Sequence, residues 1–491
     1  MGSVQLNLVL YSAEVILLLT LLFSLVVSML SKNRGLTLFT ALLGLGLAFI
    51  DACFLYQYMP QFYFTSQLSH DNFSLFFKLF FIVISAFTLL FAYESKEIDQ
   101  SRFPEFILLT LSVTIGMSTL VASINLLALY LSLELVSIVS YALAGFRKEN
   151  RFSNEASLKY LLYGAAASGT LLYGFSLLYG ITGSLNLYSI SAALGSAYIE
   201  PFALYAILLM ILFGFGFKMS MVPFHMWAPD VYQGAPTPTA AFFTVAPKIA
   251  GIAIFIRFFF TVFSNQTTTP GQWDAIPYLN WPVLIAILSA ATMTLGNLSA
   301  LFQKNAKRML AYSSIAHAGY MLMGIVVLNH SGLVAILFYA VIYALMNFGA
   351  FFVVGIVGNT YKNEDIENFK GLGWKSPLLA IPMAIFLFSL TGLPPLGGFI
   401  GKVYLFWALV EQDYYWLLIF AILNTVISLY YYAYIVKEMF LDRPQDKTQV
   451  HVSPLATGIL VTLSVPLVIL GIYWEPLYTY LSSSLRFIVT P

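Results

Sequence analysis

Four charged residues lie inside long apolar stretches and are the first candidates for chemistry. Glu134 is near the centre of LALYLSLELVSIVSYALAGF, Lys218 lies in GFGFKMSMVPF, Lys248 directly follows a proline in TVAPKIAGIAIF, and Lys402 follows TGLPPLGGFI. A charge at the centre of a bilayer costs about 2.5–3.5 kcal/mol on insertion scales, so each of these groups should face a partner or water. The lysines are about ten residues, or roughly 15 Å, from either end of their stretches, which is too far for snorkelling.

Proton transfer is the chemistry that this set of residues suits. Ser137 and Tyr141 follow Glu134 at i+3 and i+7, so one helix face is polar. Burial favours a neutral amine and a nearby carboxylate favours the ammonium, so Lys218 would release its proton when Glu134 is neutralised or moves. Moving one charge against 100 mV costs about 2.3 kcal/mol, which corresponds to a swing of about two pKa units. The alternative for Glu134 is a structural carboxyl hydrogen-bonded between helices.

Three further residues are candidate proton relays. His225, in PFHMWAPDVYQGAP, follows an interrupted helix near the inside surface, and His317 lies mid-span in YSSIAHAGY among serines and a tyrosine. An ordinary histidine pKa suits a relay, although a lone histidine is more often structural. Lys159 follows Glu155 by four residues, so a surface ion pair or interface anchoring competes with a role in the proton route.

Three charges close to predicted helix ends are interpreted as interfacial. Lys78 is expected to anchor its helix at the membrane interface. Glu14 and Asp51 approach the outer ends of their helices, and we expect both to lie at the interface as well. The polar positions Ser220, Thr244 and Ser389, together with His317, are expected to hold water between the lysines.

Composition places these residues in a membrane protein. Of 491 residues, 60% are hydrophobic, 16% are aromatic and 9% are charged, whereas soluble domains have roughly a quarter charged residues. A net charge of +1 offers no basic field for nucleic acid. The single cysteine, Cys53, cannot form an internal disulfide or ligate zinc or an iron–sulfur cluster by itself. No nucleotide fingerprint or metal-ligand spacing is present, and the amino-terminal stretch lacks the features of a secretory signal.

Division at polar and Pro/Gly breaks predicts fourteen membrane helices, because a span needs about 20 apolar residues. The predicted runs are roughly 8–31, 36–57, 74–93, 104–122, 125–146, 156–181, 201–223, 238–262, 280–302, 308–329, 333–358, 377–410, 414–437 and 454–474. The run at 377–410 is too long for one straight span and contains TGLPPLGG, so a broken helix is expected there.

The basic residues support this count and set an orientation. With both termini outside, one loop set collects most of the lysines and arginines, as the positive-inside rule requires, and the outer segments hold Arg486 alone. The inner residues are Lys32, Arg34, Lys96, Arg102, Arg147, Lys148, Arg151, Lys304, Lys307, Arg308, Lys362, Lys370, Lys375, Lys437, Arg443 and Lys447.

Two blocks of five helices are expected to form inverted repeats. We divide the chain into 1–103 (helices one to three), 104–263 (first repeat), 264–438 (second, inverted repeat) and 439–491 (a loop and the last helix). The fourth helix of each block is interrupted, at 214–224 and at 391–402, and paired breaks in inverted halves mark transporter sites near the midplane. Chance agreement between Gly/Pro breaks is the alternative.

Five segments carry a resemblance to a known family. LELVSIVSYALAGF, NEASLKYLLYGAAASGTLLYGFSLLYGITGS, FKMSMVPFHMWAPDVYQGAPTPTAAF, KRMLAYSSIAHAGYMLMG and LTGLPPLGGFIGKVYLF resemble the antiporter-like subunits of respiratory complex I over about residues 70–440. The resemblance implies fourteen helices with inverted five-helix repeats in a proton-translocating NADH:quinone oxidoreductase, a translocase. Its key glutamate corresponds to Glu134, its broken-helix lysine to Lys218, its connecting lysine to Lys248 and its outlet residue to Lys402, which is glutamate in one sibling.

The resemblance also implies partners and a location. Flavin (FMN), iron–sulfur clusters and quinone would belong to other subunits, with no cofactor in this chain. Sibling antiporter-like subunits would be neighbours in a bacterial cytoplasmic membrane. Three alternatives remain: a multi-subunit cation/proton antiporter, a related membrane-bound hydrogenase or dehydrogenase, and a structural membrane spacer, which the mid-span charges disfavour.

Overall fold

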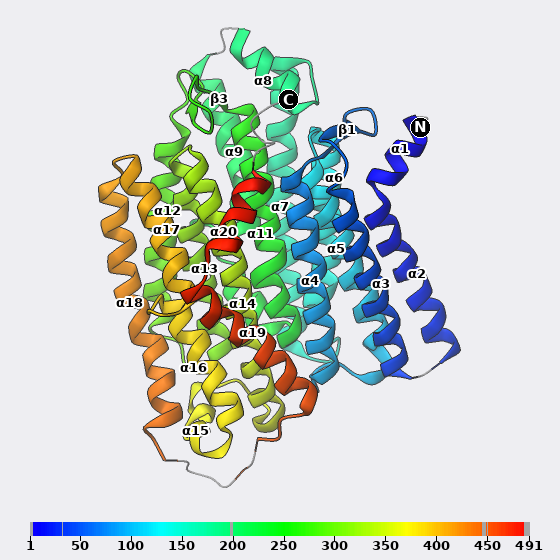
Figure 1. Cartoon of the computed structure of the whole chain (residues 1–491), viewed down its shortest axis with the longest axis vertical. Helices are drawn as coiled ribbons and strands as arrows, with labels where there is room; N and C mark the ends of the chain where they lie inside the picture. The colour runs from blue at the N-terminus through cyan, green and yellow to red at the C-terminus, as the bar shows by residue number, and fades with distance from the viewer. Residues whose placement is uncertain (1–2, 32, 197–199, 444–447, 449, 486–491) are drawn as a thin grey trace.

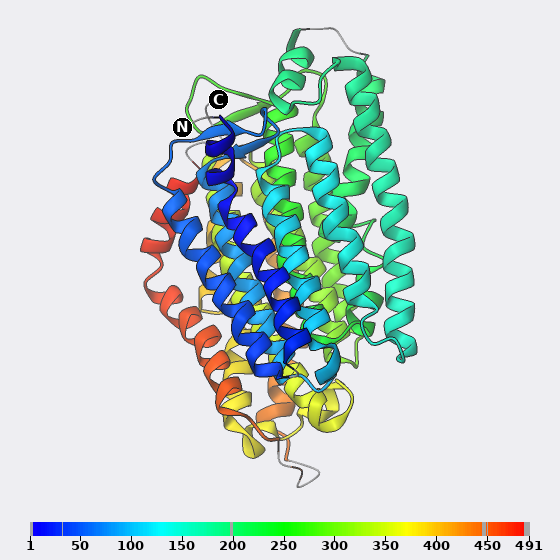
Figure 2. The same cartoon turned by 90° about the vertical axis from the view of Figure 1, so that its right-hand side faces the viewer.

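Long helices, nearly parallel to one another, make up almost all of the computed structural model (Figures 1 and 2). The structure describes residues 3–31, 33–196, 200–443, 448 and 450–485. Lys32, Lys447 and Arg486, which entered the charge count above, lie outside the described residues. One end of the bundle carries α1 (Ser3–Leu10) and two short β-hairpins and is called the hairpin end below; α15 (Leu372–Lys375) lies at the opposite end (Figure 1).

All fourteen predicted apolar runs correspond to helices. Thirteen described helices are long and apolar enough to cross a membrane, and the remaining run is formed by two shorter helices, α16 and α17. The long helices are α2 (Ser12–Leu30), α3 (Arg34–Leu55), α4 (Asn72–Glu94), α5 (Phe103–Ala122), α6 (Leu126–Ala144), α7 (Arg151–Thr182), α9 (Pro201–Met219), α11 (Thr237–Val262), α12 (Trp281–Ala300), α13 (Ala306–Val326), α14 (His330–Tyr361), α18 (Tyr415–Phe440) and α19 (Pro454–Ile472). The chain is therefore an all-helical polytopic membrane protein.

Hydropathy did not predict several short elements. Those between long helices are α8 (Leu187–Ser196), α10 (Ala228–Gly234) and the 3-10 turns Gln100–Arg102 and Ile366–Phe369, and α20 (Glu475–Ser484) follows the last long helix. The strands are β1 (Gln61–Tyr63) with β2 (Leu68–His70), and β3 (Ser264–Gln266) with β4 (Trp273–Ala275), each pair antiparallel.

Asparagine side chains begin many of the helices. Asn33, Asn125, Asn150, Asn305 and Asn329 each accept a hydrogen bond from a backbone N–H in the first helical turn. Helix α4 begins instead with an aspartate and a serine that form a reciprocal capping box. These side chains satisfy N–H groups that have no partner within a helix, so each helix has a fixed starting point beside the apolar run.

The first predicted interruption is real but lies further along the chain than Gly214. Helix α9 continues through Gly214 and Gly216 and ends at Met219, and α10 begins at Ala228. The two glycines do not end the helix because they serve packing: an added Cβ would lie 2.6 Å from Leu171 at Gly214 and 2.6 Å from Phe224 at Gly216. Small residues at such contacts let membrane helices approach closely. Lys218 is consequently the penultimate residue of α9.

The second interruption lies where TGLPPLGG predicts it. Helix α16 (Pro377–Thr391) ends in a left-handed glycine, Gly392, with φ +88°, and α17 (Gly397–Glu411) continues the span. Ser389 accepts a hydrogen bond from the backbone N–H of Gly398 at 3.1 Å. This contact joins the end of one half-helix to the start of the other, so Ser389 stabilises the break.

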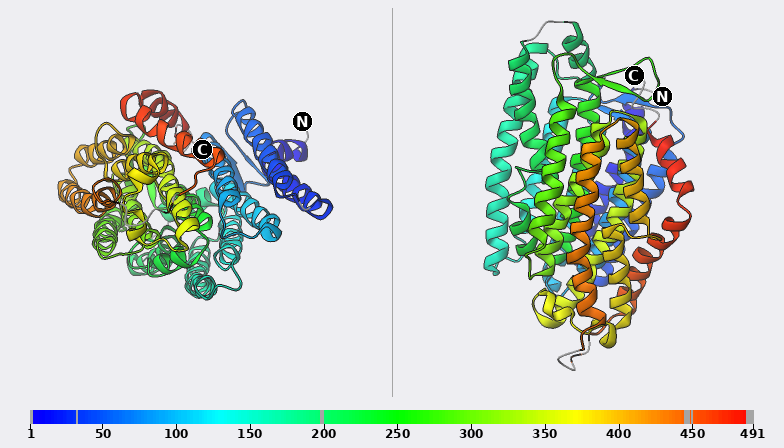
Figure 3. Two further views of the ribbon diagram at one scale, coloured as in Figure 1. Left: turned by 90° about the horizontal axis from the view of Figure 1, so that it is seen from below. Right: turned by 90° about the vertical axis from the view of Figure 1, so that its left-hand side faces the viewer.

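Helices from both predicted repeats form the centre of the bundle. Apart from Thr261, every residue of α11 is buried, and α11 packs against α4, α9, α13 and α14. Helix α13 is buried except at Arg308 and Tyr312. Helices α2 and α3 lie at one side of the bundle (Figure 3, left), with many exposed leucines and phenylalanines, as expected for side chains in contact with lipid. The polar residues of interest therefore lie where lipid cannot reach.

Replacement of Gly296 by alanine should destabilise the packing of α12 on α13. The added Cβ would lie 2.6 Å from the backbone N of Ala316 and 2.9 Å from the carbonyl O of Tyr312, and backbone atoms cannot rotate away. Overpacking of this kind costs about 1–3 kcal/mol, so the thermal unfolding midpoint of the purified chain in detergent should fall. Gly46→Ala is the control because its Cβ would meet nothing within 4 Å. Equal midpoints for the two variants would contradict the tight contact.

Candidate functional site

Lys218 is held beside Glu134 by a serine of the same polar face. Its Nζ donates to Ser137 Oγ at 3.0 Å, and its side chain is 3% exposed. Ser137 lies one turn after Glu134 on α6, at the i+3 position that the sequence indicated. The Ser137 hydroxyl donates in turn to the carbonyl O of Leu133 at 2.8 Å, and Lys218 and Glu134 form no direct ion pair in the described structure. The charge of Glu134 can still act on the Lys218 ammonium across space, because both groups belong to the same buried region.

Glu134 lines a cavity of about 600 Å³ between α6 and α7. Tyr130, Tyr141 and Ser168 line the same cavity. The side chain of Glu134 is half-buried, and its Oε1 has no hydrogen-bond partner among the described residues. A carboxylate in this setting can exchange a proton with whatever enters the cavity, and it need not break a hydrogen bond to do so.

Lys248 is buried among neutral oxygen atoms. Its Nζ donates to the carbonyl O of Ser314 at 2.9 Å and to Ser314 Oγ at 2.8 Å, and it lies 5.7 Å from the ring centroid of Tyr232 on α10. Its side chain is 1% exposed. The described structure places no carboxylate in ion-pair contact with it. Lys248 thus joins α11 of the first predicted repeat to α13 of the second.

His317 lies one turn beyond Ser314 on α13 and connects two tyrosines. Its Nδ1 is 2.7 Å from the hydroxyl of Tyr339, and its Nε2 is 3.2 Å from the hydroxyl of Tyr432. The Tyr432 hydroxyl also hydrogen-bonds to Ser313. Because a neutral imidazole donates through one nitrogen and accepts through the other, this arrangement can pass a proton along the row.

Lys402 lies beyond His317, against the second helix break. Its Nζ donates to the carbonyl O of Thr391 at 2.8 Å and to Thr425 Oγ1 at 3.5 Å. It also lies 4.6 Å from the ring centroid of Tyr320, whose hydroxyl is 3.1 Å from the same Thr425 Oγ1. Lys402 is 2% exposed. Thr391 is the last residue of α16, so its carbonyl is freed by the break, as expected for an interrupted helix.

Two glycines provide room for the lysine side chains. An added Cβ at Gly251 would lie 3.3 Å from Cγ of Lys218, and one at Gly392 would lie 2.9 Å from Cδ of Lys402. Any larger residue at these places would displace the ammonium-bearing chain. The glycines therefore help to position the lysines as well as to shape the backbone.

Polar groups without direct partners lie between Lys218 and Lys248. Ser220 Oγ and the Tyr232 hydroxyl are both buried and have no hydrogen-bond partner among the described residues. Thr244 accepts from Asn347 Nδ2 at 2.7 Å, and its carbonyl O accepts from the Tyr343 hydroxyl at 3.2 Å. Buried hydroxyls without a partner, such as that of Ser220, are the usual positions of internal water, whereas the hydroxyl of Thr244 is already bonded to protein groups. The water positions stay a prediction.

His225 is buried in the connection between α9 and α10, outside the thirteen candidate spans. Its side chain is 4% exposed, and Nδ1 has no hydrogen-bond partner in the described part of the chain. Burial lowers the pKa of His225 below its ordinary value, so the ring is neutral at pH 7. The described contacts of His225 do not include Ser314, His317 or Tyr320, the polar residues of α13 that lie between Lys248 and Lys402.

Lys159 takes part in an ion-pair cluster at the end opposite the hairpins. It forms the i,i+4 pair with Glu155 at 2.7 Å that its spacing predicted, and a second pair with Asp230 Oδ2 at 2.6 Å. Asp230 Oδ1 in turn pairs with Nη1 of Arg308 at 2.6 Å. Lys159 is about one-third exposed, so the contacts correspond to the surface-pair alternative, and the cluster ties α7, α10 and α13 together.

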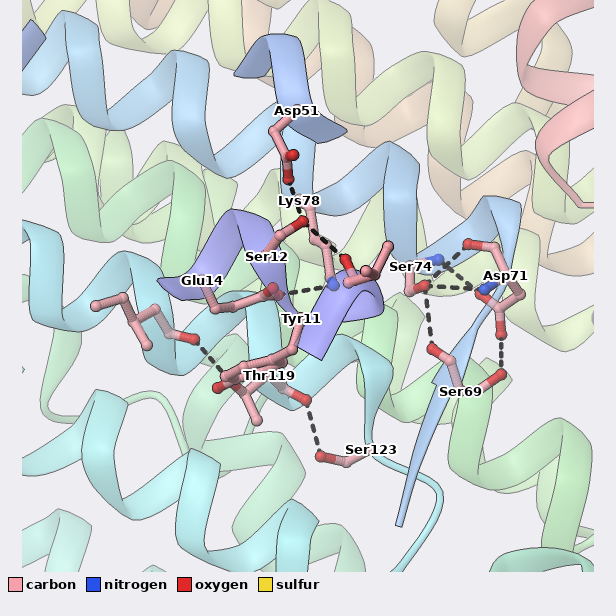
Figure 4. A network of polar contacts seen from close by, with 12 residues as sticks. Tyr11, Ser12, Glu14, Asp51, Ser69, Asp71, Ser74, Lys78, Thr119 and Ser123 are labelled. Atoms are coloured by element: carbon pink, nitrogen blue, oxygen red, sulfur yellow. Dashed lines mark hydrogen bonds and ion pairs between the residues drawn. The ribbon is translucent and has the colours of Figure 1, made fainter. Parts of the chain in front are cut away.

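The interfacial interpretation of Lys78 and Glu14 is wrong. Figure 4 shows the two side chains paired, at 2.7 Å, in a polar network near the hairpin end. Each is 1% exposed. Distance along each helix suggested an interface, but the neighbouring helices cover both residues. Asp51 is only half-buried and accepts from Ser12 at 2.5 Å (Figure 4).

The sequence did not single out several buried tyrosines that lie beside Lys248, Thr244 and His317. They are Tyr232, Tyr339, Tyr343 and Tyr432, all fully buried. A usable signal was present in α14, where Tyr339 and Tyr343 stand at i and i+4 on one face of an otherwise apolar helix. With 31 tyrosines in the chain, spacing alone does not separate these from tyrosines that anchor helices at the interface.

Comparison with known proteins agrees with this arrangement. Residues 123–428 match the family described as NADH:quinone oxidoreductase/Mrp antiporter, transmembrane, which defines the class of membrane protein. The chain is 42% identical to NADH-quinone oxidoreductase subunit N of Anaeromyxobacter sp. (strain Fw109-5), over 86% of this chain and 85% of that protein. It is 45% identical to NADH-quinone oxidoreductase subunit N 2 of Sorangium cellulosum, over 87% and 86%. The chain belongs to the subunit N family of NADH-quinone oxidoreductases.

Solved structures share the fold. A chain of respiratory complex I from Thermus thermophilus superposes with a TM-score of 0.80 at 32% identity, covering 96% of this chain and 99% of that one. A chain of the Mrp complex from Dietzia sp. DQ12-45-1b superposes with a TM-score of 0.83, covering 98% and 97%, but at 19% identity, which shows the fold alone.

The ion pairs of Asp230 should give the protein a measurable pH dependence. Asp230 lies in α10, outside the candidate spans; burial would raise the pKa of its carboxyl, but Lys159 and Arg308 outweigh burial and hold the pKa below its ordinary value. A depressed carboxyl pKa stabilises the folded state above the ordinary value of about 3.9, and the effect disappears as pH falls through the folded value. Asp230→Asn should therefore lower the unfolding midpoint equally at about pH 7 and pH 5, and progressively less below about pH 4.

The size of this effect is modest because the cluster is partly exposed. Pairs of this kind contribute about 0.2–1 kcal/mol each. Asp274→Asn is the control, since Asp274 is exposed on β4. A difference between Asp230→Asn and the unsubstituted chain that grows as pH falls would reverse the sign and contradict the assignment.

Proposed function

We propose that this chain is the proton-translocating membrane subunit of an NADH:quinone oxidoreductase, and that it moves protons through Glu134, Lys218, Lys248 and Lys402. Its relatives are named as subunits of that enzyme. The redox chemistry takes place elsewhere: flavin (FMN), iron–sulfur clusters and quinone belong to partner subunits. Sibling antiporter-like subunits are its neighbours in the membrane.

The carrying observation is that Lys248 and Lys402 are buried without a carboxylate. Among the described residues, their nitrogens hydrogen-bond to neutral oxygen atoms, at 2.8–2.9 Å for the closest contacts, and lie against tyrosine rings; both side chains are at most 2% exposed. A buried permanent charge needs a counter-charge. A lysine beside hydroxyl groups can instead gain and lose a proton. A hydroxyl accepts a hydrogen bond from the ammonium and donates one to the neutral amine, so both protonation states have a partner. Lysine, unlike arginine, can lose its proton.

Loading of the chain begins at Glu134. With Glu134 charged, the ammonium of Lys218 is stabilised by the nearby carboxylate and by its hydrogen bond to Ser137. Protonation of Glu134, or its movement within the cavity, removes that stabilisation and drives the Lys218 proton toward Lys248. The groups between them are Ser220 and Tyr232, whose hydroxyls offer sites for bridging water.

Transfer from Lys248 to Lys402 follows the polar face of α13. Ser314, His317 and Tyr320 occur at successive i+3 positions, and they contact Lys248, the tyrosine pair and Lys402 in that order. Lys248 and Lys402 therefore contact the two ends of one polar face of α13, and we propose that internal water completes the steps between its three residues. Hydrophobic residues on the other faces of α13 keep lipid and bulk water away from the row.

The energy comes from outside the chain. One charge moved against 100 mV costs about 2.3 kcal/mol, and this chain has no redox group among the residues in the row. We further propose that the end opposite the hairpins faces the cytoplasm of a bacterial cell, because the basic loop residues collect there. The hairpin end, with both termini, then faces outward.

A multi-subunit cation/proton antiporter is the competing function. The matched family includes Mrp antiporters as well as NADH:quinone oxidoreductases, and a chain of the Mrp complex has the same fold. Sodium-dependent exchange in liposomes without NADH would indicate the antiporter, whereas NADH-dependent acidification in the native assembly would indicate the oxidoreductase. The identity to subunit N relatives favours the oxidoreductase.

Lys218 offers the direct test of the proton-carrier role. Lys218→Ala should reduce NADH-driven proton pumping in reconstituted complexes by on the order of tenfold or more, since positioned proton-transfer groups contribute about 10²-fold or more to rate. Lys218→Arg should not restore pumping, because arginine keeps its proton. Normal pumping by the Lys218→Arg complex would rule out Lys218 as a carrier.

Glu134→Gln should slow turnover and leave assembly intact. Glutamine preserves the size of the side chain but cannot switch charge, and Glu134 Oε1 has no hydrogen-bond partner in the described structure whose loss would unfold the helix pair. NADH-dependent pumping and the amount of assembled complex should be measured together. Ile138→Val, at the same cavity, is the control for packing. If Glu134→Gln complexes fail to assemble, the carboxyl is structural.

A further inference from the structure

A cavity at the end opposite the hairpins lies outside the proton path described so far. It has a volume of about 690 Å³ and is bounded by α12, α13, α18 and the 3-10 turn Ile366–Phe369. Lys304, which lines it, is exposed, whereas Met309 and Tyr431, which also line it, are buried. Met309 lies about two turns before His317 on α13. The cavity therefore extends from the loops at the end of the bundle toward the polar face of α13.

The charged residues of this cavity belong to loops, and its deep wall is neutral. Lys304, Asp365 and Glu367 are the charged residues that line it, and they follow α12 or α14 in the chain. Three tyrosines also line the cavity, and Tyr431, which is 4% exposed, is the buried one among them. A proton that enters from the charged loops therefore meets the side chain of Tyr431 as it approaches the interior.

The hydroxyl of Tyr431 is held where α18 meets α12. It donates to Asn297 Oδ1 at 2.9 Å, and Asn297 Nδ2 donates to Asn424 Oδ1 at 3.1 Å. Asn424 Nδ2 donates in turn to Thr294 Oγ1 at 3.0 Å. Because an amide oxygen only accepts, the resting hydrogen of Tyr431 points to Asn297. The lone pairs of the Tyr431 oxygen are left to accept a hydrogen bond from water or from another hydroxyl.

Tyr432, the next residue of α18, connects Tyr431 to His317. The two tyrosine ring centroids are 4.4 Å apart, and the two side chains are hydrogen-bonding neighbours. The Tyr432 hydroxyl is 3.2 Å from His317 Nε2 and also hydrogen-bonds to Ser313. His317 Nδ1 is 2.7 Å from the Tyr339 hydroxyl, so a ring hydrogen on Nδ1 leaves Nε2 free to accept from Tyr432. Two hydroxyl groups thus separate the cavity from the imidazole.

We propose that this cavity is a second proton entrance, which delivers protons from the end opposite the hairpins to His317 through the hydroxyls of Tyr431 and Tyr432. A hydronium ion in the cavity gives a proton to Tyr431 and becomes water. Tyr431 passes its own hydrogen to Tyr432, which passes its own to His317 Nε2. One O–H bond breaks and one forms at each hydroxyl, an N–H bond forms on the imidazole, and no other reactant is required.

This inference rests on the proposed proton translocation and adds a second place at which protons enter. Glu134 and Lys218 load Lys248 from the first predicted repeat, and the cavity loads His317 in the second. A proton that arrives at Lys248 repels the His317 imidazolium, because like charges in a buried region destabilise one another. The imidazolium proton is thereby driven toward Lys402. Both entrances are needed for this step, so loss of either one stops pumping.

The tyrosine hydroxyls are tested in the intact complex reconstituted in liposomes. Tyr431→Phe and Tyr432→Phe should each lower NADH-driven pumping by on the order of tenfold or more, because a phenyl ring keeps the packing but cannot relay a proton. The deuterium solvent isotope effect on pumping should rise in both variants, since proton delivery then limits the rate. Tyr430→Phe is the matched control: its side chain is 68% exposed, and its hydroxyl has no hydrogen bond among the described residues.

Access through the cavity is tested by blocking it. Gln303 lines the cavity and is only half-buried, so Gln303→Cys should react with a bulky thiol reagent. The labelled complex should pump at a severalfold lower rate than before labelling. Lys148→Cys, exposed in a loop at the same end, is the control. The unsubstituted complex carried through the same labelling sets the reference, because Cys53 is exposed.

The outcomes separate the entrance from the carriers proposed above. Normal pumping by Lys218→Ala with a defect in Tyr432→Phe would remove Lys218 from the path and leave the entrance standing. A defect in Lys218→Ala with normal pumping by both Tyr431→Phe and Tyr432→Phe would overturn the entrance alone. A lower unfolding midpoint with an unchanged isotope effect would make the tyrosines structural and overturn it too. If Tyr432→Phe does not assemble, labelled Gln303→Cys decides: undiminished pumping overturns the entrance.

Discussion

The burial of lysine nitrogens away from carboxylates is the constraint on which the rest of the structure depends. A lipid-covered bundle offers no bulk water, so each nitrogen must find oxygen atoms inside the protein. Lys248 finds them on Ser314, and Lys402 finds one at the carbonyl of Thr391, which a helix break leaves free. A break in a membrane helix is usually costly, but this one frees a carbonyl oxygen that accepts the hydrogen bond from Lys402. Gly392 lets the Lys402 chain pass the break.

Arg257 differs from the lysines Lys248 and Lys402 in its surroundings. The arginine is suited to stabilising the helix bundle and the lysines are suited to transferring protons. Arg257 is fixed by a bidentate aspartate and by the carbonyl O of Val121, so it holds α11, α4 and α5 together near the hairpin end. The row lysines have sparse, neutral surroundings. Residue type and counter-charge thus distinguish the groups that stabilise the bundle from those that can change their protonation.

Apolar length and the polar and Pro/Gly breaks between apolar runs were enough to predict the helices, because both are local properties of the sequence. The shared face of Glu134 and Ser137 was likewise predictable, since the two residues are three positions apart on one helix. Contacts between helices that are distant in the sequence could not be predicted in this way. The Glu14–Lys78 pair was missed because depth along a helix says nothing about which neighbour covers a side chain. The first break was placed too early because glycine has two uses in membrane helices, packing and interruption.

Helix α10 belongs by sequence to the first five-helix block, yet it packs against α13 of the second. Asp230 on α10 joins Lys159 of α7 and Arg308 of α13, so this bridge has two members in the first block and one in the second. Helix α10 is attached to α9 by the irregular stretch 220–227 and to α11 by Ala235 and Pro236. Its ion-pair partner Arg308 lies on the helix that carries Ser314 and His317. The ion pairs of Asp230 therefore tie the break of the first block to the central polar helix of the second.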